Sequence, residues 1–322
     1  MENLLEIKNL KTYLYSNKNE IRAVDGIDLI IKQGETVALV GESGCGKSMT
    51  SLSIMGLIPK PNGKIIEGEI ILEDTNLISK SEKEMTKIRG NEIAMIFQEP
   101  MTSLNPVLTI GNQLISVIIH HLNLSKNEAK IRAIEMLEMV GFSEPEAILK
   151  NYPHRLSGGM RQRVMIAMAM SCNPKLLIAD EPTTALDVTI QAQVLELMKE
   201  LSQRFSTSIL LITHDLGVVS ELADKVVVMY AGQIVEVAEI EDLFEKPLHP
   251  YTQGLIESVP KISGDIEKLY SIPGNVPAPG TIPKGCKFAP RCKFAFDKCK
   301  EVIPSINEVE DGRQVRCFLY DE

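Results

Sequence analysis

The most constraining feature of the sequence is a glycine-rich segment near its N-terminus. Residues 41–48 read GESGCGKS and match the pattern G-x4-G-K-S. The glycines allow backbone conformations that other residues avoid, so that consecutive N–H groups can turn toward phosphate oxygens. The lysine adds a positive charge for the phosphates, and the serine hydroxyl is a ligand for Mg²⁺. The candidate contacts to a bound nucleotide are Gly41, Ser43, Gly44, Cys45, Gly46, Lys47, Ser48 and Met49, with Ser48 also a candidate Mg²⁺ ligand.

The residues on both sides of this segment favour a phosphate-binding loop over the alternative, a glycine-rich turn with a chance Lys-Ser pair. Residues 35–40 (ETVALV) form a short apolar run that is typical of a buried strand. Residues 49–55 indicate the start of a helix, whose N-terminus favours an anion. The order strand, loop, helix is the one that a phosphate-binding loop requires.

Composition excludes several classes of protein. With 322 residues and 44% hydrophobic content, the chain is long enough for one large domain and a smaller one. A net charge of -9 argues against a general affinity for nucleic acid, which depends on Lys and Arg neutralising phosphates. No window approaches the roughly 18–20 apolar residues of a membrane span, and residues 1–10 lack a secretion signal pattern. We expect a chain that neither spans a membrane nor is secreted.

The spacing of apolar residues predicts an α/β fold. Alternating apolar and polar residues at 4–15 and 23–31 predict two strands before the phosphate-binding loop, joined by a hairpin loop at 16–20. Further strands and helices then alternate along the chain, which predicts a parallel sheet. The later strands are expected at 65–72, 92–97, 175–180, 208–213 and 226–230, and the helices at 81–88, 161–170 and 190–205.

Two segments depart from this alternation. Between residues 110 and 149 the spacing becomes helical, with a capping box at Ser125 and Glu128 and a stop at Gly141. This predicts a helical subdomain at about 99–160, inserted within a core domain of residues 1–240. From residue 241 to residue 322 prolines become too dense for regular helix or sheet, so a loop-rich tail that needs a staple is expected there.

An acid pair, Asp180 and Glu181, follows the apolar run KLLIAD. Acids at the end of such a strand lie where α/β sheets bind ligands. The Asp180 carboxylate is a candidate Mg²⁺ ligand, and Glu181 can polarise a water for attack on a phosphate. The alternative is a solvated acidic helix cap.

Six motifs together resemble the ATP-binding subunit of an ABC transporter. They are GESGCGKS, Gln98, LSGGMRQR at 156–163, LLIADEP at 176–182, TALD at 184–187 and THD at 213–215. The resemblance covers residues 4 to about 236. It implies a P-loop ABC ATPase core, with a mixed sheet, N-terminal antiparallel strands and an inserted helical subdomain. It also implies ATP and Mg²⁺ as ligands, and a head-to-tail dimer that sandwiches two ATP molecules.

The same resemblance implies roles for individual residues. Glu181 would be the general base, His214 the switch that bonds the γ-phosphate, and Gln98 a Mg²⁺ sensor and catalytic residue. Ser157, Gly158 and Gly159 would contact the γ-phosphate held by the opposite subunit, and Asp187 would contact that subunit. Tyr13 and Tyr15 are the candidates for stacking on adenine, with core or edge packing as the alternative. Leu14 stands where the family's peptide importers are expected to have phenylalanine, so the choice of tyrosine stays open.

Further segments resemble the peptide and nickel branch of bacterial ABC importers, and within it the D-type subunit. They are QEPMTSLNP at 98–106, HPYTQGL at 249–255 and PGNVPAPGTIPKGCKFAPRC at 273–292. The resemblance implies import of di- or oligopeptides, or of nickel complexes, driven by ATP hydrolysis. It implies as partners a second, homologous ATPase subunit, two membrane permeases and, indirectly, an extracellular peptide-binding protein. The location would be peripheral, on the cytoplasmic face of the membrane.

Two other functions are alternatives to this one. A soluble ABC ATPase acting on DNA would carry long coiled coils or zinc modules. Here only 57 residues separate Gln98 from Leu156, no heptad repeat is sustained, and we expect no nucleic-acid partner. An iron-sulfur sensor with a vestigial ATPase is disfavoured because every chemistry-bearing motif is present.

Four cysteines in the tail, Cys286, Cys292, Cys299 and Cys317, are spaced C-x5-C-x6-C-x17-C. Zinc sites usually show closer pairs, so this spacing favours a [4Fe-4S] cluster, as does the resemblance. Zinc and a metal-free tail remain as alternatives. Six cations surround these cysteines and are expected to favour thiolates: Lys284, Lys287, Arg291, Lys293, Lys298 and Lys300. The expected role of the site is that of a structural staple.

Overall fold

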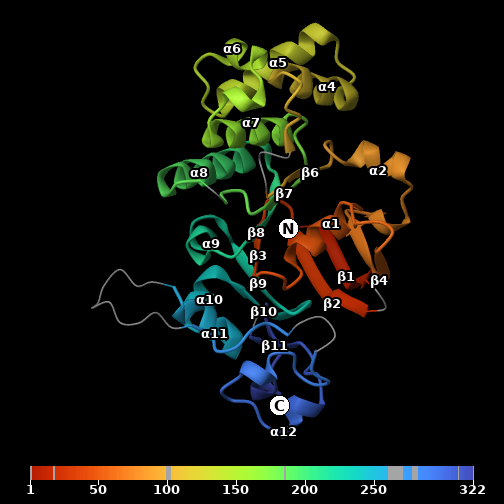
Figure 1. Ribbon diagram of the computed structural model, residues 1–322, viewed down its shortest axis with the longest axis vertical. Coiled ribbons are helices and arrows are strands. Elements are labelled where there is room, and N and C mark those ends of the chain that lie inside the picture. Colours follow the sequence, from red (N-terminus) through yellow and green to blue (C-terminus); the bar gives the residue numbers. More distant parts are fainter. Residues whose placement is uncertain are drawn as a thin grey trace. The chain divides into compact units, whose positions relative to one another are not determined.

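The structure is a computed structural model of the chain (Figure 1). The residues that it describes are 2–16, 19–98, 103–184, 186–259, 271–277, 282–310 and 312–321. The chain divides into two compact units. The first unit comprises Met1–Leu4, Ile31–Thr36 and Ser79–Ile212. The second unit comprises Leu5–Ile30, Val37–Ile78 and Thr213–Glu322.

The first unit contains three parallel strands, β6 (Ile93–Ile96), β7 (Leu176–Asp180) and β8 (Ser208–Thr213). They lie in the order β8-β7-β6. Every residue of β7 and β8 is buried, as the apolar runs predicted for strands covered on both faces.

The helices of the first unit form mainly between β6 and β7. The predicted capping box is confirmed, because the Ser125 hydroxyl accepts from the Glu128 N–H while Glu128 accepts from the Ser125 N–H. Gly141 follows the C-terminus of α5 with φ +88°, as the predicted stop requires. The helices are α2 (Glu82–Ile88), α4 (Ile110–Leu122), α5 (Lys126–Met139), α6 (Pro145–Lys150), α7 (Gly158–Met170) and α8 (Val188–Phe205).

The second unit contains a four-stranded sheet in the order β2-β1-β4-β5. Its strands are β1 (Asn3–Ser16), β2 (Asn19–Lys32), β4 (Gly63–Leu72) and β5 (Thr75–Asn76). β1 pairs antiparallel with β4, with Leu5 opposite Leu72. The two N-terminal strands are thus where the alternation predicted them, and residues 17 and 18 of the expected hairpin loop lie outside the described residues.

A second set of paired strands in this unit runs in the order β11-β12-β10-β9-β3. β3 (Thr36–Val40) pairs parallel with β9 (Lys225–Tyr230), whereas β10 (Gln233–Glu239) pairs antiparallel with β9. The sheet is therefore mixed, as expected. Its last two strands, β11 (Asn307–Glu310) and β12 (Arg313–Val315), come from the tail.

The prediction that the tail holds no regular helix or sheet is wrong. Besides β11 and β12, the tail contains α10 (Ile240–Glu245), α11 (Pro250–Glu257) and α12 (Asp297–Glu301). Pro250 is the first residue of α11, where its missing N–H costs nothing. Many of the other prolines lie in the loops between elements. The remaining short elements of this unit are α1 (Lys47–Ile54), η1 (Leu77–Ser79), α9 (Leu216–Leu222), η3 (Ala289–Arg291) and η4 (Phe318–Tyr320).

Across the described part of the chain, no helix is both long enough and apolar enough to cross a membrane.

Candidate nucleotide-binding site

The phosphate-binding loop lies between β3 and α1 in the second unit. Gly41, Gly44 and Gly46 all have positive φ, at +150°, +79° and +111°. A Cβ on Gly41 would lie 2.2 Å from the Met229 carbonyl oxygen, and one on Gly46 would lie 2.2 Å from the Ala23 carbonyl oxygen. Glycine is therefore required at these two positions both by backbone conformation and by space.

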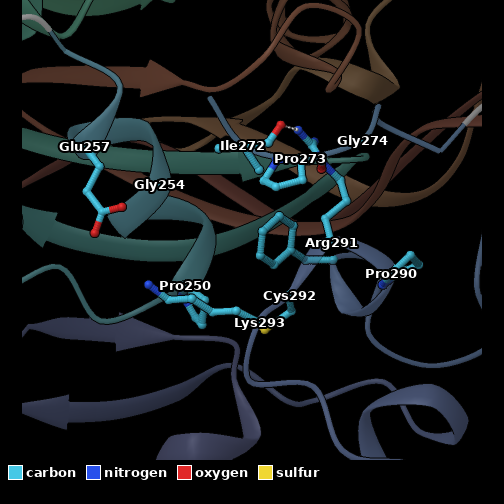
Figure 2. A pocket seen from close by; sticks show the side chains of 11 residues that line it. Pro250, Gly254, Glu257, Ile272, Pro273, Gly274, Pro290, Arg291, Cys292 and Lys293 are labelled. Carbon is cyan, nitrogen blue, oxygen red and sulfur yellow. Dashed lines mark hydrogen bonds between the residues drawn. The ribbon is translucent and has the colours of Figure 1, made fainter. Parts of the chain in front are cut away.

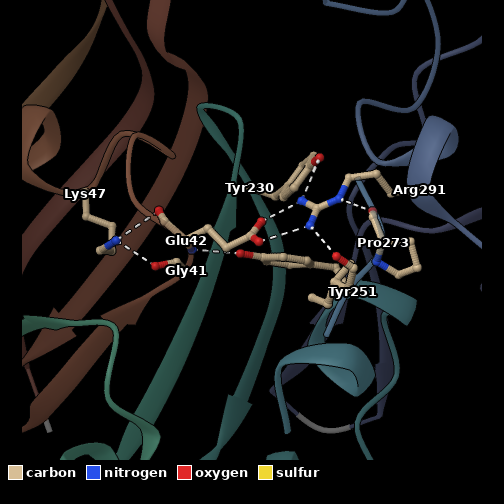
Figure 3. A network of polar contacts seen from close by, with 8 residues as sticks. Gly41, Glu42, Lys47, Tyr230, Tyr251, Pro273 and Arg291 are labelled. Atoms are coloured by element: carbon tan, nitrogen blue, oxygen red, sulfur yellow. Dashed lines mark hydrogen bonds and ion pairs between the residues drawn. The ribbon is translucent and has the colours of Figure 1, made fainter. Parts of the chain in front are cut away.

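Lys47 supplies the positive charge of this loop. Its side chain is buried, and Nζ donates to the carbonyl oxygens of Gly41 at 2.7 Å and Glu42 at 3.1 Å (Figure 3). Gly46 is the N-cap of α1 and offers no side chain, so no side-chain cap covers the first N–H groups of the helix. A lysine and an open helix N-terminus thus complement a phosphate group at one loop. Ser48 is exposed, whereas Cys45 is buried.

The first tyrosine candidate for adenine stacking, Tyr13, is only 8% exposed. Its hydroxyl donates to Asp25 at 2.8 Å, and the Arg22 guanidinium lies 5.5 Å from the ring centroid. Burial and the bond to Asp25 raise the pKa of Tyr13 to about 12. An adenine ring on this face would take the place of Arg22. Tyr15 is 40% exposed.

In the first unit, Gln98 and Glu181 are in direct contact. Glu181 Oε2 accepts from Gln98 Nε2 at 2.8 Å and from the Thr184 hydroxyl at 2.9 Å. Glu181 follows directly on β7, and its φ is +48°, a conformation that non-glycine residues seldom adopt. Asp180, the last residue of β7, is buried. Strained conformations of this kind cluster at functional sites, where the surrounding structure holds them.

Two helix caps of the first unit contain the candidate contacts to a second subunit. The Ser157 hydroxyl caps α7 by accepting from the Met160 N–H, and Gly158 is exposed. The Asp187 carboxylate caps α8 by accepting from the Ile190 N–H at 3.0 Å, a role that sequence analysis missed. A Cβ on Gly159 would lie 2.8 Å from the side chain of Ile190, so glycine allows α7 to approach α8. Ser157 and Asp187 are exposed.

His214 follows β8 and is exposed. The next residue, Asp215, caps α9 by accepting from the Gly217 N–H at 2.8 Å. The predicted site residues thus fall into two sets. The second unit holds Tyr13, the phosphate-binding loop and His214. The first unit holds Gln98, Ser157, Gly158, Gly159, Asp180, Glu181 and Asp187.

The four tail cysteines line one pocket, together with Phe288 and Phe318. Their side chains are free thiols. Among the described residues, no group of three or more His, Cys, Asp or Glu side chains is arranged to hold a metal ion. The arrangement therefore does not support the metal-stapled tail that the sequence predicted.

The expectation that local cations favour thiolates is wrong. Burial raises the pKa of the thiols of Cys286, Cys292 and Cys317, the last to about 11. Two of the six cations do not line the cysteine pocket and pair with carboxylates elsewhere. Lys287 Nζ lies 2.8 Å from an oxygen of Asp25, and Arg291 pairs with Glu42. Because these charges are paired elsewhere, burial decides the pKa of the thiols.

A second pocket has a volume of about 340 Å³ (Figure 2). It is lined by residues of α11, by residues 272–274 and by residues 288–293, among them Arg291 and Cys292. Cys292 contributes to the walls of both pockets.

The sequence matches two protein families in two separate stretches. Residues 24–184, half of the chain, match the family described as "ABC transporter". The oligopeptide transport ATP-binding protein AppD of Bacillus subtilis (strain 168) is 66% identical over 322 residues, which are 100% of this chain and 98% of the relative. The chain belongs to the ABC transporter family.

Other members of the ABC transporter family agree with this result. The oligopeptide transport ATP-binding protein OppD of the same strain is 52% identical, over 98% of this chain and 88% of the relative. A solved structure described as the dimeric structure of MJ0796, a bacterial ABC transporter cassette, has a TM-score of 0.66 and 30% identity. The match covers 73% of this chain and 98% of that one. The fold of this ABC transporter subunit is thus that of a P-loop ABC ATPase with a mixed sheet.

The tail of this ABC ATPase has a family of its own. Residues 235–299 match the family described as "Oligopeptide/dipeptide transporter, C-terminal region". That stretch begins in β10 and includes α10, α11 and three of the four tail cysteines.

Proposed function

We propose that the chain is the ATP-hydrolysing subunit that powers import of di- or oligopeptides through a membrane ABC transporter. The observation that carries the proposal is the family match of the tail. The chain joins an ABC ATPase to an oligopeptide/dipeptide transporter C-terminal region, and over its full length it is 66% identical to an oligopeptide transport ATP-binding protein. The same machinery importing nickel complexes is the second candidate.

The chemistry follows from the residues of the two units. Lys47 and the open N-terminus of α1 would bind the phosphates of ATP, the substrate. Ser48, Asp180 and Gln98 would hold Mg²⁺, which neutralises phosphate charge when bound. Glu181 would accept a proton from the attacking water. Its contact with Gln98 supports this role, because the amide holds the carboxylate in one orientation.

The proposed assembly is a pair of ATPase subunits, the second a homologue or a copy of this chain. Exposed Ser157, Gly158 and Asp187 support the pairing, since a partner can reach the caps of α7 and α8. Gly159 and His214 would complete contacts to the γ-phosphate. Two membrane permeases and, indirectly, an extracellular peptide-binding protein would join this pair. The chain would then lie on the cytoplasmic face of the membrane.

We also propose a division of labour along the chain. Residues 1–240 would form the ATP-binding domain, with a helical subdomain at about 99–160. Residues 241–322 would form the tail specific to this transporter branch. Tyr13 stays our candidate for contact with adenine, in a nucleotide-bound form in which Arg22 leaves the ring.

The substitution Glu181→Gln tests the catalytic part of the proposal. The variant should bind ATP, lose ATP turnover by more than about 100-fold and accumulate as a closed dimer, because the amide cannot accept the proton. Glu196→Gln, an exposed position on α8, is the control and should turn over ATP normally. Turnover retained by Glu181→Gln would remove that residue from the role of base.

The identity of the transported substrate is tested with the assembled complex. ATP hydrolysis by this subunit together with permeases and binding protein should rise when the binding protein is loaded with a peptide. Stimulation by a nickel complex and not by peptides would favour the second candidate. No stimulation by either would contradict both.

We further propose that Cys286, Cys292, Cys299 and Cys317 hold a [4Fe-4S] cluster, with Zn²⁺ as the alternative. The four thiols line one pocket, which supports a shared site, although among the described residues no group of three or more His, Cys, Asp or Glu side chains is arranged to hold a metal ion. A tetrahedral zinc site needs four sulfurs at about 2.3 Å from one ion, whereas a cluster spreads its ligands around a larger core. Burial raises the pKa of three of these thiols. The thiols would release their protons when the cluster or the zinc ion binds.

Iron, sulfide and zinc analysis after anaerobic purification tests this second proposal. About four irons and four sulfides per chain, with a broad visible absorption band, is the expected result. Cys299→Ser should lose the iron, whereas Cys172→Ser, a buried cysteine of the first unit, should retain it. One zinc would support the alternative, and a metal-free protein would overturn both.

A further inference from the structure

An arginine of the tail contacts the phosphate-binding loop directly. The Arg291 guanidinium pairs with both carboxylate oxygens of Glu42, at 2.6 Å from Nη1 and 3.0 Å from Nη2 (Figure 3). The Arg291 side chain is only 4% exposed and that of Glu42 is 31% exposed. Exposed ion pairs contribute little to stability, whereas a largely buried, two-pronged pair restricts both partners strongly.

Glu42 is the second residue of the phosphate-binding loop, and three of its groups are in use. Its carboxylate accepts from Arg291, and its N–H donates to the Tyr251 hydroxyl at 2.8 Å. Its carbonyl oxygen accepts from Lys47 Nζ at 3.1 Å. One residue thus joins two parts of the tail, Arg291 and α11, to the lysine of the loop (Figure 3).

Arg291 is itself held in one conformation. Nε donates to the Pro273 carbonyl oxygen at 2.9 Å, and Nη2 donates to that of Ile272 at 3.3 Å. The guanidinium lies 5.8 Å from the ring centroid of Tyr230 and 5.9 Å from that of Phe288. With Nη1, Nη2 and Nε all engaged, the guanidinium that meets Glu42 has little freedom left to lose.

A second contact of the same tail segment reaches another strand. Lys287, four residues before Arg291, donates to Asp25 on β2 and to the Ala231 carbonyl oxygen, each at 2.8 Å. Residues 287–291 therefore contact the phosphate-binding loop, β2 and the turn that follows β9.

We propose that Arg291 is a positioning residue for ATP binding. By holding Glu42, it fixes the backbone at the start of a loop whose glycines would otherwise allow many conformations. A loop already held in one conformation loses less entropy when ATP binds, so its affinity is higher. The proposal rests on the proposed function of the loop as the ATP phosphate site. A tail that merely docks on the ATPase would make no such contribution.

The test measures equilibrium binding of ATP to the full chain. Arg291→Met should weaken ATP binding by about 10-fold, and Arg291→Lys, which keeps the charge but not the two-pronged pair, by about 3-fold. In ATPase assays of the complex, the substitution should raise KM for ATP and leave kcat close to its normal value. Thermal unfolding of each variant shows whether it is folded.

A double-mutant cycle separates positioning from tail docking. Glu42→Gln should weaken ATP binding, and adding Arg291→Met to it should have little further effect, because the contact is already lost. Arg316→Met is the matched control. This tail arginine donates to the Ile234 carbonyl oxygen on β10, and its loss should leave ATP affinity within about 2-fold of normal. Equal losses for Arg316→Met and Arg291→Met would overturn the proposal.

Lys47→Ala distinguishes failure of this proposal from failure of the proposed function. Loss of ATP binding in Lys47→Ala with normal binding in Arg291→Met would refute only the positioning role. Normal ATP binding in Lys47→Ala would refute the phosphate site itself, and the positioning role with it.

Discussion

The phosphate-binding loop at 41–48 and the tail segment at 286–292 are both irregular, yet they are fixed in different ways. The loop is shaped by its own glycines and by the strand and helix that flank it. The tail segment is held by ion pairs to Asp25 and Glu42, which are 262 and 249 positions away in the sequence. Local stereochemistry can be predicted from a motif, whereas distant pairs become visible only in the folded chain.

The largest effect is expected where a distant contact is cut. Arg313 on β12 lies 3.5 Å from Glu236 on β10, and both side chains are almost fully buried. Arg313→Met would leave the Glu236 charge without this partner, so we expect a loss of about 3 kcal/mol of unfolding free energy. Urea denaturation measures it. Lys298→Met, which breaks an exposed pair with Asp321, should cost at most about 1 kcal/mol. Equal losses of unfolding free energy in the two variants would show that burial does not strengthen the ion pair.

Changes inside the loop should come next. Gly46→Ala places a Cβ against the Ala23 carbonyl oxygen at a positive φ, which should cost roughly 2–3 kcal/mol and lower ATP affinity by more than about 100-fold. Gly44→Ala is the matched control, because its φ is +79° but nothing lies within 4 Å of the added Cβ. It should cost only about 1 kcal/mol. Calorimetric unfolding and ATP titration compare the two.

A buried histidine of the tail should make stability depend on pH. His249 caps α11 by accepting from the Tyr251 N–H at 3.0 Å, and burial, followed by the charge of Arg316, lowers its pKa from 6.5 to about 3. Between these values the unfolded chain binds a proton and the folded chain does not, so stability falls as pH falls below 6.5. The loss should reach about 2 kcal/mol at pH 5.

His249→Asn tests this pH dependence, because asparagine can cap the helix but cannot take up a proton. Urea midpoints at pH 7 and pH 5 should converge in the variant relative to the unchanged chain. An unaltered difference between the two midpoints would assign the acid loss to other groups.

The smallest effect is expected at a purely local contact. Ser125→Ala removes half of the capping box of α5 and should cost about 1 kcal/mol. Ser116→Ala, on α4, is the control and should cost less, because the Ser116 hydroxyl only donates to the carbonyl oxygen of Gln113 in the same helix. Thermal unfolding of both variants checks the order.

Sequence reasoning succeeded where the signal is local. The capping box at Ser125, the apolar strands β7 and β8 and the positive φ of Gly46 follow from neighbouring residues. It failed in the tail, because β12 has only three residues and is defined by its pairing with β10. A strand of three residues is too short to show the alternation of apolar and polar residues by which strands are predicted.

The candidate site shows the same limit. The sequence shows that cations surround the tail cysteines, but not that Lys287 and Arg291 turn toward distant carboxylates. Alternation predicted the strand of Tyr13, but not that Arg22 lies over its ring. Side-chain direction across the fold decides both, and it is set by packing among residues far apart in sequence.

The pair formed by Arg291 and Glu42 has a consequence for how such chains diverge. Neither residue can be replaced alone without leaving a poorly solvated charge behind. Substitutions at the two positions should therefore occur together during evolution. A lineage that discards the tail loses the partner of Glu42, and selection for an acid at the second position of its phosphate-binding loop should relax.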